Sequence, residues 1–420
     1  MLSIELLLNL SFVLLMSLLG LAVPAGVARL SGRALGEKDS AISGRLLLAG
    51  ILTLLISFAC GFSLQYGSIH APSLGEVPRA AWEWAPLGAG SGLLSWSGPL
   101  VPADPGRLVL FCFQAVGAAT VVVLALAPVC GRMPGPSFVA AALFVGGVLY
   151  PLLGHWTWGG GWLAATGTTA YLGHGLVDWG GAGVLYGLGG MVALAGLLAV
   201  GGRRDPVTME QGPAVGAALL STLGIAALNM GAGWSLSPHL PLILVNTLLS
   251  AAAAAVVAAV YMAFTTARFR IAMVGRGLLA GAAASAGLAR FAPPPTLLLV
   301  GAVAGLLACL GSFLFERVWR LDDRGGIVSS FGLGGLWGLL AVGLVSDGTL
   351  GQGLHGIGPD NYLGVASQGV SGIALLAPGM VPDPGQLIAQ VLGLLVIVVL
   401  ALGPAWLILR LGSVRPGGRE

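Results

Sequence analysis

Long apolar segments recur along the whole chain, and this recurrence limits the fold more than any other feature. Each of about eleven segments is roughly 20 residues long, the length that a helix needs to cross a bilayer. They lie near 4–28, 46–66, 108–130, 136–155, 180–201, 213–233, 238–264, 274–290, 295–316, 327–346 and 386–411. Only 8% of the 420 residues are charged, too few to cover a soluble domain. We therefore expect an all-α integral membrane protein with membrane lipid as its surroundings.

The basic residues give an independent test of the number of segments. Nearly all of them follow an odd-numbered segment and so fall on one side of the membrane, whereas Arg79, Arg107 and Arg290 fall on the other. By the positive-inside rule, this predicts a plasma (inner) membrane protein with its N-terminus outside and its C-terminus in the cytoplasm. The two long outer loops, at about 67–107 and 347–385, are expected to form a lid or a subunit contact.

One aromatic residue followed by Gly-Leu-Gly-Gly occurs twice, at Tyr186 and at Phe331. Each lies eight positions after an aspartate, Asp178 or Asp323, which corresponds to roughly 12 Å along a helix. Five segments separate the two starting points, so the two patterns enter the membrane from opposite faces and their rings are expected to meet near its centre. This predicts an inverted repeat of two five-helix halves. The expected parts are halves at about 1–205 and 206–346 and a final helix at about 386–411, within one domain, 1–420.

Several stretches resemble motifs of the ammonium transporter (Amt/Rh) family. They are Gly61-Phe-Ser-Leu-Gln-Tyr-Gly67, His155-Trp-Thr-Trp-Gly-Gly-Gly-Trp-Leu-Ala164, Asp178-Trp-Gly-Gly, Gly224-Ile-Ala-Ala-Leu-Asn-Met-Gly-Ala232 and Leu321-Asp322-Asp323. The resemblance runs in order from the first segment to the last, and it agrees with eleven spans and an outside N-terminus. It implies a homotrimer with one narrow hydrophobic pore in each subunit.

The resemblance implies an outer vestibule and gate where ring faces and a hydroxyl hold a cation, because a ring face attracts positive charge. This chain keeps two of the aromatic residues, as Phe113 and Trp158. It departs from the pattern at Gly117 and Leu228, each in place of a phenylalanine, and at Ala232, in place of a serine. The glycine at position 117 is expected to widen the outer entrance.

Two polar residues of these motifs are interpreted as structural. Asp178 lies just before a helix start, where a carboxylate can accept hydrogen bonds from free N–H groups. Asn229 matches the asparagine of the family's motif. The short run from His174 to Asp178 is interpreted as structural as well.

The resemblance places Tyr186 and Phe331 at the pore centre, where the family has paired histidines. Histidine titrates near neutral pH, whereas tyrosine titrates near pH 10 and phenylalanine does not titrate. No charged residue lies in the middle of a predicted segment, where ion and proton pathways usually carry one. All five histidines fall in outer loops or at outer ends of segments: His70, His155, His174, His239 and His355.

Three functions remain open from the sequence. The first is an ammonium/ammonia transporter-like membrane channel with an altered pore. The second is a non-conducting scaffold, a sensor or a subunit of a larger membrane complex, because two facing aromatic residues would plug a narrow pore. The third is a conduit for another small neutral solute. The sequence holds no soluble-enzyme motif, phosphate-binding loop or metal-spaced His/Cys set, so we expect no enzyme, cofactor, metal site or nucleic-acid partner.

Overall fold

The computed structural model of the chain describes residues 3–34, 39–66, 82–86, 92–101, 103–201, 212–266, 270–323, 325–357 and 368–413. Among these residues, ten apolar helices are long enough to cross a bilayer, and a shorter apolar helix covers Val215–Gly231. Each of the eleven predicted segments coincides with one of these helices. The protein is therefore an all-α integral membrane protein, because a helix satisfies its own backbone hydrogen bonds inside the bilayer.

The helices follow one another in chain order, with π-helical and 3₁₀ turns between them. The first part holds α1 (Ile4–Gly20), α2 (Ala22–Ala34), α3 (Asp39–Ile56), η1 (Ser57–Gly61), α4 (Phe62–Gln65), α5 (Pro105–Leu126), η3 (Ala127–Val129), α6 (Gly135–Phe144), η4 (Val145–Leu149), α7 (Tyr150–Trp158), α8 (Trp162–Thr169), η5 (Ala182–Gly187) and α9 (Leu188–Val200). The second part holds α10 (Gly212–Gly231), α11 (Leu240–Thr266), α12 (Ile271–Leu288), α13 (Pro294–Phe313), η6 (Leu314–Val318), η7 (Ile327–Gly332) and α14 (Leu333–Val345). The last part holds η8 (Leu354–Gly356), α15 (Pro384–Leu400), η9 (Ala401–Ala405) and α16 (Trp406–Ser413).

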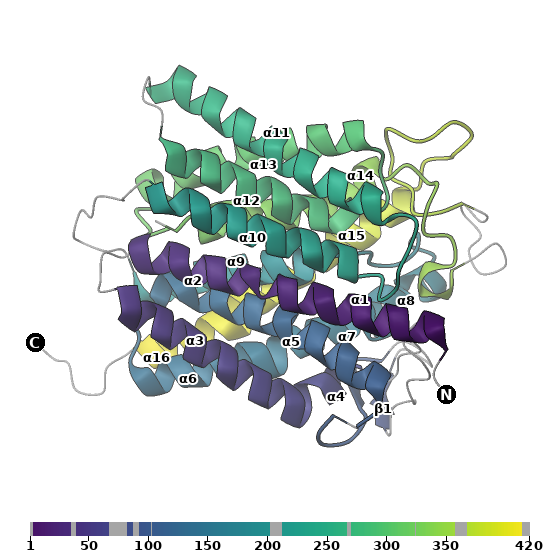
Figure 1. Ribbon diagram of the computed structural model, residues 1–420, viewed down its shortest axis with the longest axis horizontal. Helices are drawn as coiled ribbons and strands as arrows, with labels where there is room; N and C mark the ends of the chain where they lie inside the picture. The colour runs from purple at the N-terminus through teal and green to yellow at the C-terminus, as the bar shows by residue number, and fades with distance from the viewer. Residues whose placement is uncertain are drawn as a thin grey trace, which may run out of the picture.

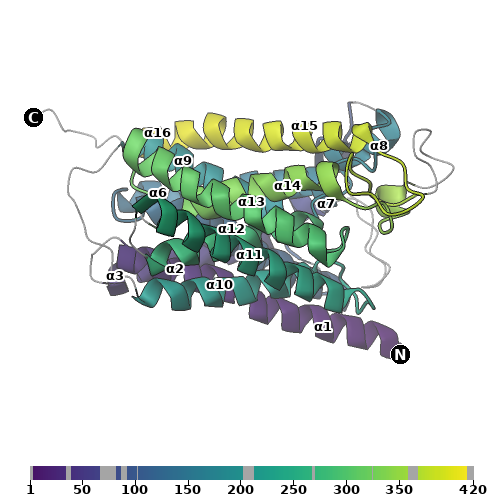
Figure 2. The same ribbon diagram turned by 90° about the horizontal axis from the view of Figure 1, so that it is seen from above.

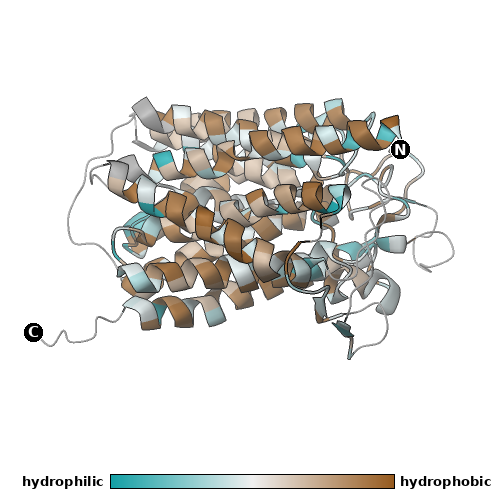
Figure 3. Cartoon of the chain, turned by 60° about the horizontal axis from the view of Figure 1, so that its bottom comes forward, coloured by the Kyte–Doolittle hydropathy of each residue, from teal (hydrophilic) through white to brown (hydrophobic). Residues whose placement is uncertain are grey.

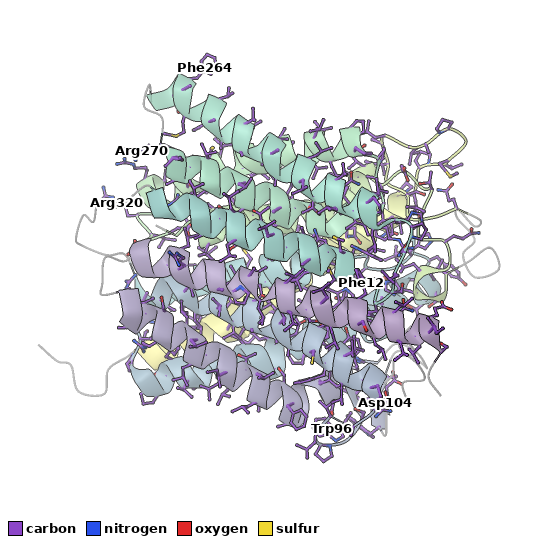
Figure 4. All side chains as sticks on the ribbon, viewed as in Figure 1. Phe12, Trp96, Asp104, Phe264, Arg270 and Arg320 are labelled. Carbon is purple, nitrogen blue, oxygen red and sulfur yellow. The ribbon has the colours of Figure 1, made fainter. Side chains whose placement is uncertain are left out.

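The long helices lie side by side along one direction (Figure 1), and α1 and α15 run along opposite edges of the bundle (Figure 2). Apolar residues cover the length of the helices, with more polar residues toward the ends (Figure 3). Arg270 and Arg320 lie at one end of the bundle, and Trp96 and Asp104 lie at the other (Figure 4). We call the end with Trp96 and Asp104 the outer end, after the side of the membrane on which the sequence analysis expects it.

The outer end carries two elements that the sequence did not predict. Strands β1 (Trp82–Trp84) and β2 (Leu94–Trp96) pair antiparallel, with Trp82 opposite Trp96. Alternating large aromatic residues favour a strand over a helix, so part of the predicted first loop is a small hairpin. The short helix α8 also lies in a region predicted as loop. Residues 67–81, 87–91 and 358–367 of the two predicted loops lie outside the described residues.

Glycines let the two aromatic-Gly-Leu-Gly-Gly stretches cross at close range. A Cβ added at Gly190 would overlap the Cα of Gly332. Correspondingly, a Cβ added at Gly335 would lie 2.6 Å from the backbone nitrogen of Gly187. Gly190 and Gly335 each lie four residues after their aromatic residue. The two backbones therefore meet in a reciprocal way, which only a residue without a side chain permits at these positions.

Candidate functional site: an aromatic cavity below an outer vestibule

A cavity of about 700 Å³ opens at the outer end, and we call it the outer vestibule. Its walls come from residues between Trp158 and Trp179, from 232–234, from Arg290 and Phe291, and from 353–356. These residues are far apart in the sequence and lie in or beside the connections between helices. The outer vestibule is thus built by loops that the helix bundle positions, the usual arrangement for a binding surface.

A second, much smaller cavity of about 30 Å³ lies beside the outer vestibule, and we call it the inner aromatic cavity. All five residues predicted for the vestibule and gate line it: Phe113, Gly117, Trp158, Leu228 and Ala232. Gln114, Tyr150, Trp179, Gly180, Leu185 and Trp234 complete its lining. Trp158, Trp179, Ala232 and Trp234 line both cavities, so they form the junction between the two. The volume admits only a molecule of about the size of water or ammonia.

Two tryptophans at this junction are held by hydrogen bonds to the backbone. Trp158, at the end of α7, donates from Nε1 to the carbonyl oxygen of Asp178 at 2.8 Å. Trp179 donates from Nε1 to the carbonyl oxygen of Asn229 at 2.9 Å. With their polar edges bound in this way, both rings keep fixed positions in the lining of the two cavities. The face of such a ring attracts a cation electrostatically.

The expected wide entrance at Gly117 is not present. A Cβ added at Gly117 would lie 2.5 Å from the Tyr150 hydroxyl oxygen and 3.2 Å from a methyl carbon of Leu185. The space that a larger residue would occupy is therefore filled by these two side chains. The sequence prediction was wrong because it considered position 117 alone and not the residues that pack against it from α7 and η5.

A buried polar cluster that the sequence analysis missed sits against the inner aromatic cavity. The Tyr150 hydroxyl donates to Gln114 Oε1 at 2.6 Å, and Gln65 Nε2 donates to the same oxygen at 3.1 Å. Gln114 Nε2 donates in turn to the Tyr66 hydroxyl at 2.5 Å. Gln114 and Tyr150 both line the cavity. A glutamine inside an apolar segment was the available signal, because polar groups are costly within a membrane unless they are hydrogen-bonded.

Asp178 caps the start of η5. Its Oδ2 accepts hydrogen bonds from the backbone N–H groups of Gly183 at 3.0 Å and Val184 at 2.8 Å. Between them and the aspartate, Gly181 has a φ of 85°, in the left-handed region that suits glycine. The carboxylate therefore meets the free N–H groups and positive end of the following helix, the capping geometry expected from the sequence.

Asp323 makes the same arrangement at η7. Its Oδ1 and Oδ2 accept from the N–H groups of Val328 at 3.0 Å and Ser329 at 2.9 Å, and Gly326 has a φ of 68°. The offsets from the aspartate to the glycine and to the two N–H groups equal those at Asp178. We call residues 178–187 the Asp178 turn and residues 323–332 the Asp323 turn, of which Arg324 lies outside the described residues.

Tyr186 and Phe331 lie at the same place in these two turns and touch each other. Their ring centroids are 5.9 Å apart, the rings are inclined by 32°, and both side chains are fully buried. Neither ring lines the outer vestibule or the inner aromatic cavity. The Tyr186 hydroxyl is buried without a hydrogen-bond partner among the described residues. Each ring stands on a π-helical turn, a distortion that is frequent at functional sites.

Asn229 joins three helices beside this site. Its Nδ2 donates to Thr247 Oγ1 at 3.0 Å on α11 and to Ser285 Oγ at 3.2 Å on α12. Its backbone oxygen accepts from Trp179. Asn229 therefore links α10 to α11 and α12 through its side chain and holds one junction tryptophan through its backbone.

The last membrane helix holds the segment that leads into the Asp178 turn. Gln386 Oε1 accepts from the N–H of His174 at 2.8 Å, and Gln386 Nε2 donates to the carbonyl oxygen of Gly175 at 2.9 Å. Gln390 makes the same pair of bonds with Val177, at 2.9 and 2.7 Å. The side-chain amides of Gln386 and Gln390 thus hydrogen-bond the backbone of this segment, as a neighbouring strand would.

Two histidines outside the membrane-spanning helices lie beside the same segment. His355 lines the outer vestibule and donates from Nε2 to the carbonyl oxygen of Leu176 at 3.1 Å. Burial lowers the pKa of His355 to about 4. Burial, with a smaller contribution from neighbouring His355, lowers the pKa of His174 to about 4. Both imidazoles are therefore neutral at pH 7. Among the described residues, no group of His, Cys, Asp or Glu is placed to hold a metal ion; His70 lies outside that part of the chain.

A bundle of this kind, with an aromatic cavity below an open vestibule, defines a membrane channel or transporter. A family model described as the Ammonium Transporter Family matches residues 11–416. The chain belongs to that family.

Individual relatives agree with this assignment. The chain is 29% identical over 310 residues to ammonium transporter Amt2 of Archaeoglobus fulgidus, covering 71% of this chain and 62% of that protein. It is 28% identical over 309 residues to a putative ammonium transporter of Synechocystis sp., covering 70% and 65%. In both cases the chain spans less than two thirds of the relative's length.

Solved structures share the fold. A protein described as "Sensor Amt Protein" superposes with a TM-score of 0.77 at 21% identity, covering 97% of this chain and 93% of that one. Mep2 of Candida albicans superposes with a TM-score of 0.74 at 20% identity, covering 96% and 83%.

Proposed function

We propose that this protein is an ammonium transporter-like channel, not an enzyme, and that ammonium or ammonia enters it through the inner aromatic cavity. The observation that carries the proposal is the convergence of Phe113, Trp158, Trp179 and Trp234 on one cavity of about 30 Å³ below the outer vestibule. Ring faces suit an ammonium-sized cation, and the volume is on the scale of such a small molecule. Membership in the ammonium transporter family supports the same substrate.

The solute then passes the pore centre in uncharged form. Tyr186 and Phe331 stand at that centre, and neither side chain can take up a proton at neutral pH. An ion in a narrow apolar path would lose its hydration without compensation. The residues at positions 186 and 331 therefore favour ammonia over ammonium for this step.

A second function is favoured by the contact between the two rings. With centroids 5.9 Å apart and both side chains fully buried, Tyr186 and Phe331 leave little room between them. A protein that binds ammonium at the inner aromatic cavity and does not conduct it would serve as a sensor or as a subunit of a larger membrane complex. One structural neighbour carries the description "Sensor Amt Protein".

Uptake of labelled methylammonium into liposomes separates these functions. The unmodified protein is expected to take it up, and Trp158→Leu is expected to lower uptake about tenfold, the scale of one desolvated cation–π contact. Trp82→Leu is the matched control, because Trp82 lies on β1, is 54% exposed and lines neither cavity. An ammonium-dependent current through the unmodified protein would contradict passage in uncharged form.

The non-conducting alternative has its own outcome. Uptake only by Tyr186→His plus Phe331→His would support the plugged form, and uptake by the unmodified protein would exclude it. If neither protein conducts methylammonium, osmotic shrinkage of the same liposomes in small neutral solutes tests the remaining function, a conduit for another such solute.

We also propose a homotrimer in the plasma membrane, with the N-terminus outside, two inverted five-helix halves and a final helix. The matched offsets of the Asp178 and Asp323 turns support the inverted halves. The position of Arg270 and Arg320 at the end opposite Trp96 and Asp104 supports the orientation (Figure 4). Mass measurement in nanodiscs tests the trimer, and labelling of single cysteines from each side of the membrane tests the orientation.

A further inference from the structure

Arg290 places a positive charge at the mouth of the proposed ammonium pathway. It follows the end of α12 and lines the outer vestibule. Its guanidinium carbon lies 4.5 Å from the centroid of the Trp179 ring. Trp179 lines both cavities, so this guanidinium stands on the ring at the junction between them.

The Trp179 ring is a fixed platform for this side chain. Its Nε1 is bound to the carbonyl oxygen of Asn229 at 2.9 Å. The ring of Phe291 packs edge-on against it, with centroids 5.7 Å apart and planes at 87°. Gly233 borders it so closely that an added Cβ would lie 3.1 Å from the ring. The guanidinium therefore has a defined place, because a planar cation stacked on a held ring loses little further freedom.

The charge of Arg290 is not balanced by a neighbouring carboxylate in the part of the chain that the structure describes. The ion pair found there joins Arg276 and Glu316. The Nε of Arg290 is buried and makes no hydrogen bond to any described residue. Asp178 also lines the outer vestibule. Its Oδ2 accepts from the N–H groups of η5, and its Oδ1 is buried with no hydrogen-bond partner among the described residues, so neither oxygen is bound to Arg290. His355 is bound through Nε2 to a backbone oxygen. A fixed positive charge thus faces a cavity of about 700 Å³.

We propose that the outer vestibule binds a small monoanion, a halide or a short carboxylate, on the guanidinium of Arg290. Arginine presents several N–H donors in one plane and remains charged at every accessible pH. Hydrogen bonds between a guanidinium and an anion are among the stronger ones in proteins. The partly enclosed wall of the outer vestibule raises their strength further, because it lowers the local dielectric constant. This site lies at the entrance of the proposed path of ammonium, but binding of an anion there does not depend on transport.

Iodide is a suitable probe, since it is a small monoanion that quenches tryptophan fluorescence. The full-length protein in detergent is titrated with iodide at constant ionic strength. A saturable quenching component is expected, in addition to the linear collisional quenching that exposed tryptophans such as Trp82 give. The chain has 11 tryptophans, so Trp179→Phe assigns the signal: it should remove most of the saturable component.

Substitutions at Arg290 decide the proposal. Arg290→Gln keeps a polar but shorter side chain and removes the charge, and it is expected to weaken the saturable component about tenfold or more, the scale of one charge-assisted hydrogen bond. Arg290→Lys keeps the charge and should retain part of the affinity. Unchanged iodide affinity in Arg290→Gln, or no saturable component in the unmodified protein, would overturn the proposal. Equal melting temperatures of the unmodified protein, Arg290→Gln and Arg290→Lys control for folding. Competition by acetate at constant ionic strength extends the site to carboxylates.

Discussion

The Asp178 turn and the Asp323 turn hold their aromatic residues in the same way but lie beneath different surroundings. The outer vestibule lies over the Asp178 turn. Over the Asp323 turn lies Arg276, which donates to the carbonyl oxygen of Asp323 at 3.1 Å and pairs with Glu316 at 2.6 Å. The same capped backbone turn therefore sets the depth of Tyr186 and of Phe331. The surroundings differ, because an open vestibule lies over the Asp178 turn and a charged arginine lies over the Asp323 turn.

Removal of either capping carboxylate is expected to give the largest loss of stability, and it tests whether the two turns are equivalent. Asp178→Ala and Asp323→Ala each leave two buried N–H groups without an acceptor, and each is expected to lower the free energy of unfolding by about 3 kcal/mol or more. Denaturation by SDS in mixed micelles measures the effect. Asp104→Ala is the control, since Asp104 caps the exposed start of α5 with one bond to Arg107 and should cost only about 1 kcal/mol. A loss at one turn alone would show that the two turns are not equivalent.

The crossing glycines give the next largest effect. Gly190→Ala and Gly335→Ala each place a methyl group against the backbone of the other turn, and each is expected to cost about 1–3 kcal/mol in the free energy of unfolding. Gly216→Ala on α10 is the matched control, because no atom lies within 4 Å of its added Cβ, and it should be neutral or slightly stabilising. If either crossing glycine accepts alanine as readily as Gly216 does, the close backbone contact is not formed.

Tyr186 and Phe331 differ by one hydroxyl group, and substitution of each by the other's residue type tests the effect of that group. Tyr186→Phe removes a buried hydroxyl that has no partner among the described residues, so it should stabilise the protein by about 1 kcal/mol. Phe331→Tyr adds such a group and should destabilise it by a similar or larger amount. Thermal melting in detergent measures both. A clear loss of stability in Tyr186→Phe would mean that the hydroxyl binds water or solute in the membrane protein.

The smallest expected effect concerns pH and the two histidines beside the segment that leads into the Asp178 turn. Histidine in the unfolded chain titrates near pH 6.5, whereas the pKa values of His174 and His355 are lowered to about 4. Between these values the unfolded state binds more protons, so the stability present above pH 6.5 falls as the pH is lowered toward 4. Melting temperatures from pH 7.5 to 4.5 measure this.

His355→Gln should flatten part of that pH slope, because glutamine can still donate to Leu176 and does not titrate. His239→Gln, at the start of α11, is the control substitution. An identical slope in the unmodified protein, His355→Gln and His239→Gln would mean that other groups cause the pH dependence. The Asp323 turn contains no histidine that could do so.

The helices and the two matched turns followed from the sequence because the bilayer fixes the length of a spanning helix and the aspartates mark the same depth twice. The contact between Tyr186 and Phe331 followed for the same reason. For the inner aromatic cavity, the sequence predicted five lining residues but not the rest of the lining or the filled space at Gly117. Trp179 and Trp234 reach it from connections whose path depends on the packed bundle, and the space at Gly117 is filled by Tyr150, which lies 33 positions further along the chain.

The attachment of α15 to the segment before Asp178 connects the outer vestibule mechanically to the surrounding lipid. The helix runs along an edge of the bundle (Figure 2) and exposes Ile388, Leu395 and Val399. Helices at such an edge tilt when the bilayer thickens or thins. Because Gln386 and Gln390 are hydrogen-bonded to the segment before Asp178, such a tilt would displace this part of the vestibule wall. Lipid thickness would then adjust the opening through these two glutamines, without a change at the inner face.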